Sequence, residues 1–146
     1  MRIGDLEVGR VFLAPMEEVT DRAFRRLCKR MGADVMYTEF VPAEAMVRNI
    51  AAAERKMTFG DEERPLGIQI YGNRIEGMVD AALMAAARKP DILDINFGCP
   101  VKKVAMGDRE SCSGSGLLRF PDAMEEITAA VVEAMKAHPN DASVQE

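Results

Sequence analysis

The chain has 146 residues, about the length of one domain, and 48% of them are hydrophobic while 29% are charged. This composition excludes a disordered or collagen-like chain and supplies enough apolar side chains for a core. With 24 acidic against 19 basic residues, the net charge of −5 excludes a uniformly basic protein that coats nucleic acid.

The sequence argues against secretion, membrane insertion and metal binding. No apolar stretch reaches the roughly 18 residues of a membrane-spanning helix, and acidic residues interrupt the N-terminal segment where a signal peptide is apolar. The three cysteines, Cys28, Cys99 and Cys112, lack CxxC spacing, which disfavours a disulfide framework or a zinc site. A single histidine, His138, argues against Ser-His-Asp chemistry and multi-histidine metal sites. We therefore expect a cytoplasmic protein without a metal centre.

Short apolar segments alternate with stretches of helical periodicity along the chain. Four apolar segments rich in β-branched and aromatic residues predict strands over residues 11–16, 35–41, 66–72 and 92–98. Apolar residues that recur every three or four positions predict helices over residues 20–31, 43–56, 75–88 and 121–137. We expect Thr20 to cap the first helix and Gly32 to end it. This alternation of strands and helices indicates parallel βαβ units and the α/β class.

Two α/β architectures compete for this pattern. A doubly wound sheet has a glycine-rich turn after its first strand, whereas the corresponding segment here, APMEEVTD, contains no glycine. A (β/α) barrel carries its chemistry at the carboxyl ends of its strands. Polar or reactive residues occupy those positions here: Met16 with Glu17, Glu39, Gln69 with Tyr71, and Asn96 with Cys99. We therefore expect a TIM-type barrel. Because a complete barrel needs about 250 residues, we expect only about the first four βα units, over residues 1–137, followed by a polar tail over 138–146.

The segment DINFGCPVKKV is the most informative in the chain. Cys99 lies between a glycine, which permits a tight turn, and a proline, which fixes the next φ, so its thiol is held at a defined position. Lys102 and Lys103 would favour the reactive thiolate form if they point inward. Such a thiol suits proton donation or nucleophilic chemistry, and the alternative is a small buried side chain without a chemical role.

Two amides and a proline at predicted strand ends are further candidates. Gln69 is flanked by two isoleucines and must point to the opposite face, where it contacts a ligand or a neighbouring strand-end group. Asn96 either offers its amide to a planar ligand or caps the turn after its strand. Pro15 either lets a flat ligand approach the backbone closely or simply ends the first strand.

Two other segments admit both a functional and a structural interpretation. Five cations share one side of the first predicted helix: Arg22, Arg25, Arg26, Lys29 and Arg30. They form either a set of phosphate contacts or a solvated face. The loop over residues 105–118 contains an SGSG sequence and is either a flexible cover over a site or a surface loop, and Cys112 within it has no evident role.

Taken in order, several segments of the chain resemble the tRNA-dihydrouridine synthase family. They extend from residue 3 to about residue 136 and read LAPMEEVTDRAFRRLCKRMGAD, YTEF, ERPLGIQIYG, PDILDINFGCPVKKV and GSGLL. The GCPVKKV sequence after a DIN strand is highly specific, and APM-x-x-VTD is independent support. The resemblance implies an FMN-containing (β/α)8 barrel followed by a small helical domain. It also implies reduction of tRNA uridines to 5,6-dihydrouridine, with NADPH as the reductant of the flavin.

The resemblance implies a role for each candidate residue. Cys99 matches the catalytic cysteine that protonates C5 of the uracil as hydride from the flavin reaches C6. Gln69 matches the glutamine that hydrogen-bonds the flavin ring, and Asn96 matches an asparagine near the flavin and the base. Three adjoining residues match the segment whose backbone lies against the isoalloxazine: Pro15, Met16 and Glu17. The implied cofactors are FMN and NADPH, and the implied partner is tRNA, with no metal and no membrane.

Two features depart from the family's pattern. The family's later strands carry a lysine and a histidine that hold the flavin ring and phosphate, and neither has a counterpart here, since His138 lies in a different context. The loop over residues 105–116 is also longer and more charged. We expect the chain alone to bind FMN weakly or not at all, and its unpaired strand edges to favour self-association. The alternatives are another FMN barrel that reduces a free pyrimidine and a non-catalytic fragment.

Overall fold

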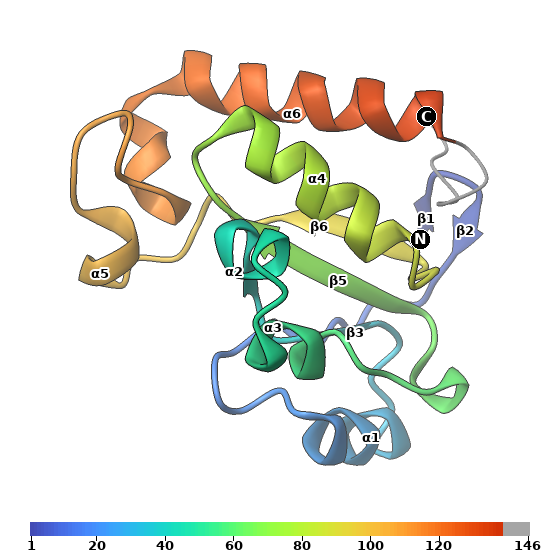
Figure 1. Cartoon of the computed structure of the whole chain (residues 1–146). Coiled ribbons are helices and arrows are strands. Elements are labelled where there is room, and N and C mark those ends of the chain that lie inside the picture. Colours follow the sequence, from blue (N-terminus) through green and yellow to red (C-terminus); the bar gives the residue numbers. More distant parts are fainter. Residues whose placement is uncertain (139–146) are drawn as a thin grey trace.

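A parallel sheet runs through the middle of the molecule in the computed structural model, which describes residues 1–138 (Figure 1). Its strands are β3 (Met36–Tyr37), β4 (Val41–Pro42), β5 (Leu66–Tyr71) and β6 (Ile92–Ile95). β5 pairs with β3 and β4 along one edge and with β6 along the other, always in parallel. The predicted α/β class with a parallel sheet is therefore confirmed, while the predicted tail lies, apart from His138, outside the described residues.

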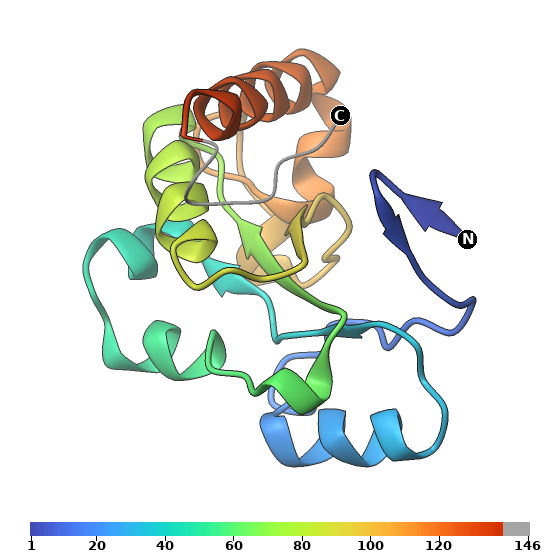
Figure 2. The ribbon, with the colours of Figure 1, turned by 90° about the vertical axis from the view of Figure 1, so that its right-hand side faces the viewer.

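The order of the strands in the sheet follows their order in the chain. Phe12 bridges to Val35, the strand that follows Val35 pairs with β5, and β5 pairs with β6. α4 (Ile75–Ala86) packs against β5 and β6, and α6 (Pro121–Ala137) packs against α4, as Figure 2 shows. A doubly wound sheet reverses its strand order at a switch point. The described strands show no such reversal.

The first predicted strand is much shorter than expected. Within the described chain an isolated bridge between Phe12 and Val35 forms where a strand over residues 11–16 is predicted. The N–H of Leu13 donates to the carbonyl of Val35 at 2.9 Å, and the N–H of Val35 donates to the carbonyl of Val11 at 3.2 Å. Pro15 has no N–H with which to continue the ladder, so the pairing ends before it. The predicted extent of this strand is wrong.

The second strand contains one residue more than the strand it pairs with. Met36 lies opposite Leu66 and Val41 lies opposite Ile70, so five steps along one strand match four along the other. Such a bulge bends a strand and re-aims its side chains, and bulges are common next to functional sites. The bulge divides the predicted strand over residues 35–41 into β3 and β4.

α1 (Arg22–Arg30) begins at a different capping residue from the one predicted. The carboxylate of Asp21 accepts a hydrogen bond of 2.8 Å from the backbone N–H three residues further on. The hydroxyl of Thr20 instead bonds the N–H and the carbonyl of Met16, so the prediction of Thr20 as the cap is wrong. Gly32 has a φ of +100°, the left-handed conformation that glycine favours, and ends the helix as predicted.

The predicted helix over residues 43–56 is two helices, α2 (Ala43–Val47) and α3 (Ala51–Lys56). Asn49 between them has a φ of 52°, a left-handed conformation that asparagine adopts more readily than most residues. Its N–H donates to the carbonyl of Met46 at 2.8 Å, which closes α2. α6, by contrast, has the predicted bounds and carries proline in its first turn.

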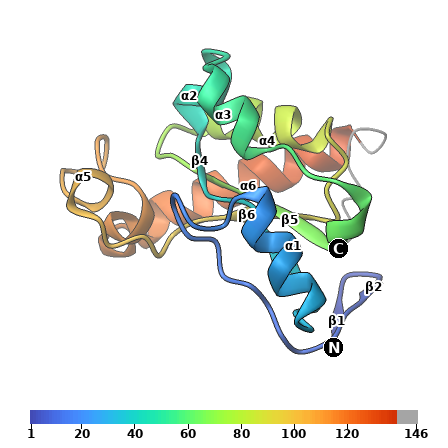
Figure 3. The same cartoon turned by 90° about the horizontal axis from the view of Figure 1, so that it is seen from below.

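The sequence pattern does not predict several short elements. They are β1 (Arg2–Ile3), β2 (Leu6–Glu7), η1 (Asp61–Glu63), α5 (Lys102–Ala105) and η2 (Gly114–Arg119). β1 and β2 form an antiparallel hairpin in which Gly4 has a φ of 55°. α5 lies beyond the carboxyl end of β6, as Figures 1 and 3 show. Each of these elements is too short for its hydrophobic periodicity to reveal it.

Apolar side chains fill the space between the sheet and α4. Leu66, Ile68 and Ile70, at alternate positions of β5, belong to the buried core together with four alanines of α4: Ala81, Ala82, Ala85 and Ala86. Because successive side chains of a strand point to opposite faces, the intervening residues of β5 point away from α4. The candidate site lies on that second face. Among residues 1–138, no helix has the length and apolar character needed to cross a membrane.

Candidate functional site

Polar and aromatic side chains share the face of the sheet that points away from α4. Gln69 lies between two isoleucines of the core and therefore points to this face, and Asp94 of β6 lies directly opposite it in the parallel register. Tyr37 lies opposite Gly67, where a side-chain carbon would fall 2.5 Å from the tyrosine ring. Glycine at this position therefore leaves room for the phenol on the polar face.

A line of hydrogen bonds connects this face to the turn after β6. Gln69 donates from Nε2 to Oδ2 of Asp94 at 2.5 Å, and Asn96 donates from Nδ2 to Oε1 of Gln69 at 2.8 Å. Oδ1 of Asn96 accepts the backbone N–H groups of Gly98 at 3.0 Å and of Cys99 at 2.8 Å. The structure therefore brings together three predicted site residues, Gln69, Asn96 and Cys99. Both amides make the structural contacts considered for them, a strand-end partner and a turn cap.

The turn that carries the thiol is packed beneath the loop that follows it. Cys99 is 8% exposed, and its carbonyl accepts the N–H of Ser115 at 3.0 Å. Gly114 has a φ of 53°, and a side-chain carbon there would lie 2.9 Å from the carbonyl oxygen of Cys99. Lys102 and Lys103 begin α5 and are exposed. Their positions therefore do not support the prediction that inward-pointing lysines favour the thiolate form of Cys99.

The segment after the first strand is closed into a turn by Thr20. Its hydroxyl donates to the carbonyl of Met16 and accepts from the N–H of the same residue, both at 3.0 Å. Lys56 of α3 donates to the carboxylate of Glu17. Pro15 is half-buried and Met16 lies at the surface. Within residues 1–138, no hydrogen bond joins Pro15 or Met16 to the two amides of the sheet.

Tyr71, at the carboxyl end of β5, lies near both Glu17 and Cys99. Burial raises the pKa of its phenol above the usual 10.0, and the nearby Glu17 and Cys99 side chains raise this pKa further. The ring of Phe40 packs edge-on against Tyr71, with 5.5 Å between the ring centroids. Glu17 and the turn that carries Cys99 therefore both lie close enough to Tyr71 to affect its pKa.

Asp94 is the acidic side chain of the polar face. Burial raises the pKa of its carboxyl above the usual 3.8, and the hydrogen bond from Gln69 offsets part of this rise. The pKa of Tyr37 is raised, chiefly by burial and further by the charge of Asp94. Neither residue has a role predicted from the sequence. The period of two along a strand, which puts Asp94 on the face of Asn96, is the signal that identifies it.

Most of the cations predicted to share one side of α1 are engaged by acids. Arg25 is 2% exposed and pairs with Glu63, with 2.6 Å between Nε and Oε2, so its placement on a solvated face is wrong. Arg22 and Arg26 pair with Glu62 at 3.0 and 3.2 Å. These ion pairs favour the structural interpretation of the helix over phosphate contacts.

The loop over residues 105–118 is anchored at several points. The N–H of Ser113 donates to the carbonyl of Val104 at 2.8 Å, and Arg119 donates to the carbonyl of Gly107 at 2.7 Å. Cys112 is fully buried and has a packing role that its sequence context does not indicate. The anchors favour a packed surface loop. Within the part of the chain that the structure describes, no three histidine, cysteine, aspartate or glutamate side chains gather as metal ligands.

These features define an α/β protein in which two linked amides hold the backbone of a cysteine-bearing turn near the carboxyl ends of parallel strands. The family model described as dihydrouridine synthase matches residues 12–144 of the chain. The chain belongs to this family.

Curated relatives agree with this assignment and are longer than the chain. A probable tRNA-dihydrouridine synthase of Aquifex aeolicus is 43% identical over 131 residues, which are 89% of this chain and 40% of the relative. The tRNA-dihydrouridine synthase B of Vibrio vulnificus is 36% identical, and that of Escherichia coli K12 is 37% identical, each over 136 residues. Those matches cover 92% of this chain and 41% of each relative. The chain therefore spans about two fifths of the length of the relatives it matches.

Proposed function

We propose that this chain is the N-terminal part of a flavin-dependent tRNA-dihydrouridine synthase, with residues 1–137 as the first four βα units of a (β/α)8 barrel. The reaction reduces uridine in tRNA to 5,6-dihydrouridine in the cytoplasm, with NADPH as the reductant. The family match supports the reaction, and the strand order, which follows the chain without reversal, supports the barrel. The observation that carries the proposal is the line of hydrogen bonds from Gln69 through Asn96 to the backbone of Cys99.

The polar face of the sheet fits the edge of a flavin ring. Gln69 and Asn96 keep hydrogen-bonding capacity beyond their present contacts, because an amide carries two N–H groups and an oxygen with two lone pairs. The pyrimidine end of isoalloxazine alternates acceptors with an N–H donor and so matches such amides. Pro15, Met16 and Glu17 would lie against the ring. None of these five residues is a cation suited to the flavin phosphate, which agrees with the weak FMN binding expected of the chain alone.

In the proposed reaction, Cys99 holds the proton that the substrate receives. Its Sγ donates this proton to C5 of the uracil, and the cap provided by Asn96 fixes the turn that carries Cys99. FMN, when bound and reduced by NADPH, supplies the hydride that C6 receives. The low exposure of Cys99 limits the access of water to the thiol.

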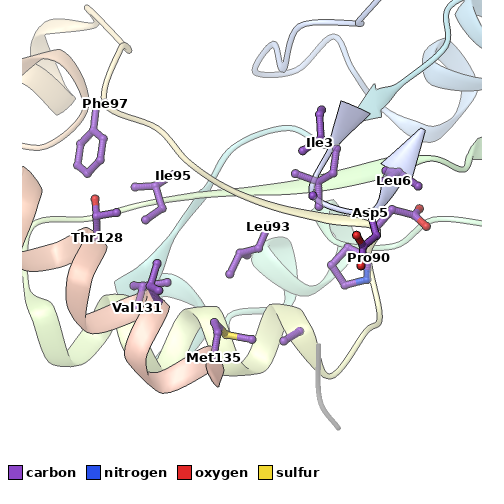
Figure 4. Close-up of a pocket in the computed structure, with 15 residues that line it drawn as sticks. Ile3, Asp5, Leu6, Pro90, Leu93, Ile95, Phe97, Thr128, Val131 and Met135 are labelled. Atoms are coloured by element: carbon purple, nitrogen blue, oxygen red, sulfur yellow. The ribbon is translucent and has the colours of Figure 1, made fainter. Parts of the chain in front are cut away.

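An apolar groove along β6 is where we propose that the next βα unit of the barrel packs. Within residues 1–138, β6 pairs only with β5, so its other edge is open. A groove of about 610 Å³ lies there, and Figure 4 shows Leu93 and Ile95 of β6 across it from Val131 and Met135 of α6. Because each strand is added in chain order and the relatives are longer than the matched region, a following strand in such a protein would extend the sheet at this edge.

A hybrid enzyme tests the proposed function. Residues 1–138 of this chain replace the aligned part of the Escherichia coli relative, and the hybrid is produced in a strain that lacks that relative. Restored dihydrouridine in tRNA, measured by mass spectrometry of nucleosides, is the expected result. A hybrid that binds flavin but reduces a free pyrimidine and no tRNA uridine would identify the alternative FMN barrel. A hybrid with neither flavin nor product would identify the non-catalytic fragment.

A further inference from the structure

We infer that Asp94 is a positioning residue: it fixes the orientation of the Gln69 and Asn96 amides and, through them, the turn that carries Cys99. The inference rests on the proposed function only for the chemical role of the thiol. Its geometric basis is the set of hydrogen bonds that begins at the carboxylate of Asp94 and ends at the backbone N–H of Cys99.

Each contact in this set permits one direction of donation. An ionised carboxylate only accepts, so the atom of Gln69 that faces Asp94 must be Nε2. The oxygen of Gln69 then faces Asn96, which must present its nitrogen to it. The remaining oxygen of Asn96 faces the turn, where both groups within reach are N–H donors. The carboxylate acceptor at one end of this set and the backbone N–H donors at the other therefore require the same orientation of the two amides.

Every other arrangement of the two amides creates a repulsive contact. Turning Gln69 alone brings its oxygen against the carboxylate of Asp94, and turning Asn96 alone brings its nitrogen against the N–H of Cys99. Turning both creates these two contacts together. Gln69 is 8% exposed, so water does not readily replace a lost partner. The arrangement observed is the one that satisfies all of these groups.

Removing the carboxylate of Asp94 therefore removes the first hydrogen bond of this set. Asp94→Ala leaves Nε2 of Gln69 without its partner, so Gln69 is held in this line through Asn96 alone. Asp94→Asn keeps an oxygen that accepts the same hydrogen bond. A role in orientation thus predicts that asparagine rescues the turn at Cys99 and alanine does not.

Alkylation of the 146-residue chain by iodoacetamide, resolved by residue with mass spectrometry, tests this inference without flavin, NADPH or tRNA. We expect Asp94→Ala to raise the rate at Cys99 by about tenfold, the effect of one lost buried hydrogen bond. We expect Asp94→Asn to stay close to the unaltered chain. Asp80→Ala, on the exposed side of α4, is the matched control and leaves the rate unchanged. The fully buried Cys112 reports whether the fold opens.

Three results would overturn the inference: an unchanged rate at Cys99 in Asp94→Ala, an equal rise at Cys112, or no rescue by Asp94→Asn. If Asp94→Ala does not fold, nuclear magnetic resonance of the unaltered chain decides. The side-chain amides of Gln69 and Asn96 and the N–H of Cys99 must then shift together as Asp94 gains its proton in acid. Tyr37, which faces Asp94 from β3, stays protonated there because its pKa lies above 10.0. These measurements are independent of the hybrid assay, so the failure of one proposal is distinguishable from the failure of the other.

Discussion

Arg25 of α1 and Glu63 of η1 form an ion pair inside the protein, with 2.6 Å between Nε and Oε2 and with 2% and 0% of the side chains exposed. The same guanidinium donates to the carbonyls of Thr20 at 2.8 Å and Thr58 at 2.9 Å. One cation therefore joins the turn before α1, the segment after α3 and η1. Through its bond to the carbonyl of Thr20, Arg25 connects the end of the loop that carries the candidate residues 15–17 to α1 and η1.

Arg25→Met is expected to lower the free energy of unfolding by about 3 kcal/mol, because it removes the closest cation from the buried carboxylate of Glu63, which keeps Arg22 at 3.4 Å and the N–H of Gly60 at 2.8 Å. Urea unfolding followed by circular dichroism measures this loss. Arg26→Met is the matched control, since its ion pair with Glu62 is exposed and a much smaller loss follows. Equal losses in the two variants would contradict the importance assigned to the buried pair.

Gly114→Ala is expected to destabilise the protein and displace the turn at Cys99. The left-handed φ of 53° strains any other residue, by about 1–3 kcal/mol. The new methyl group would also lie 2.9 Å from the carbonyl oxygen of Cys99. Gly32→Ala is the control, because its φ is +100° and nothing lies within 4 Å. Both substitutions strain the backbone, and only the one at Gly114 also places a methyl group against a neighbouring atom. Thermal unfolding measures both variants, and a loss of stability at Gly114 no larger than that at Gly32 would disprove the effect of this close contact.

Cys99→Ala in the hybrid enzyme is expected to abolish the product while sparing the cofactor. Loss of a general acid lowers the rate by about a hundredfold or more, so dihydrouridine in tRNA falls by that factor while bound flavin persists. Nucleoside mass spectrometry and visible absorbance measure the two quantities. Cys28→Ala on α1 is the control and retains both. Undiminished dihydrouridine in Cys99→Ala would remove the thiol from the role of proton donor.

The raised pKa of Asp94 predicts a pH dependence of stability with a definite sign. The folded state holds this proton more tightly than the unfolded state does, so the contribution to stability is complete below the usual pKa of 3.8. It is lost as the pH rises from there through the raised pKa of the folded state. Unfolding free energies of the unaltered chain, measured relative to Asp94→Asn across this range, should fall with rising pH. A difference that rises instead would show that the carboxylate is favoured in the fold.

The open groove predicts that the isolated chain self-associates. Val132 of α6 lines the groove and is 41% exposed, so Val132→Lys is expected to shift the chain toward monomer. Sedimentation velocity over a range of concentrations measures this shift. Met31→Lys alters an exposed side chain of comparable character just after α1, outside the groove, and leaves the association unchanged. A chain that is monomeric at every concentration would contradict the prediction.

The parts of the fold with a regular pattern could be predicted from the sequence. β5 is predicted from a run of apolar residues that Gln69 interrupts. Because side chains along a strand alternate between its two faces, the pattern also predicts the face to which Gln69 points. The bounds of α6 follow from Pro121 and a long amphipathic stretch. The position of Cys99 after β6 follows from the glycine and proline beside it.

The remaining features depend on partners that are distant in the sequence. The break at Asn49 needs a left-handed residue that a helical period does not reveal. The burial of Arg25 depends on Glu63, 38 positions away. The room for Tyr37 depends on Gly67 in the neighbouring strand. A pattern read along one segment contains none of this information, because packing between segments decides it.

The succession of strands in chain order has a consequence for synthesis on the ribosome. Each strand pairs with the one made just before it, from the bridge at Phe12 and Val35 to the pairing of β6 with β5. Within residues 1–138, each newly emerged strand of the parallel sheet therefore finds one neighbour already present. This layout allows the sheet to grow vectorially from its first edge while translation continues.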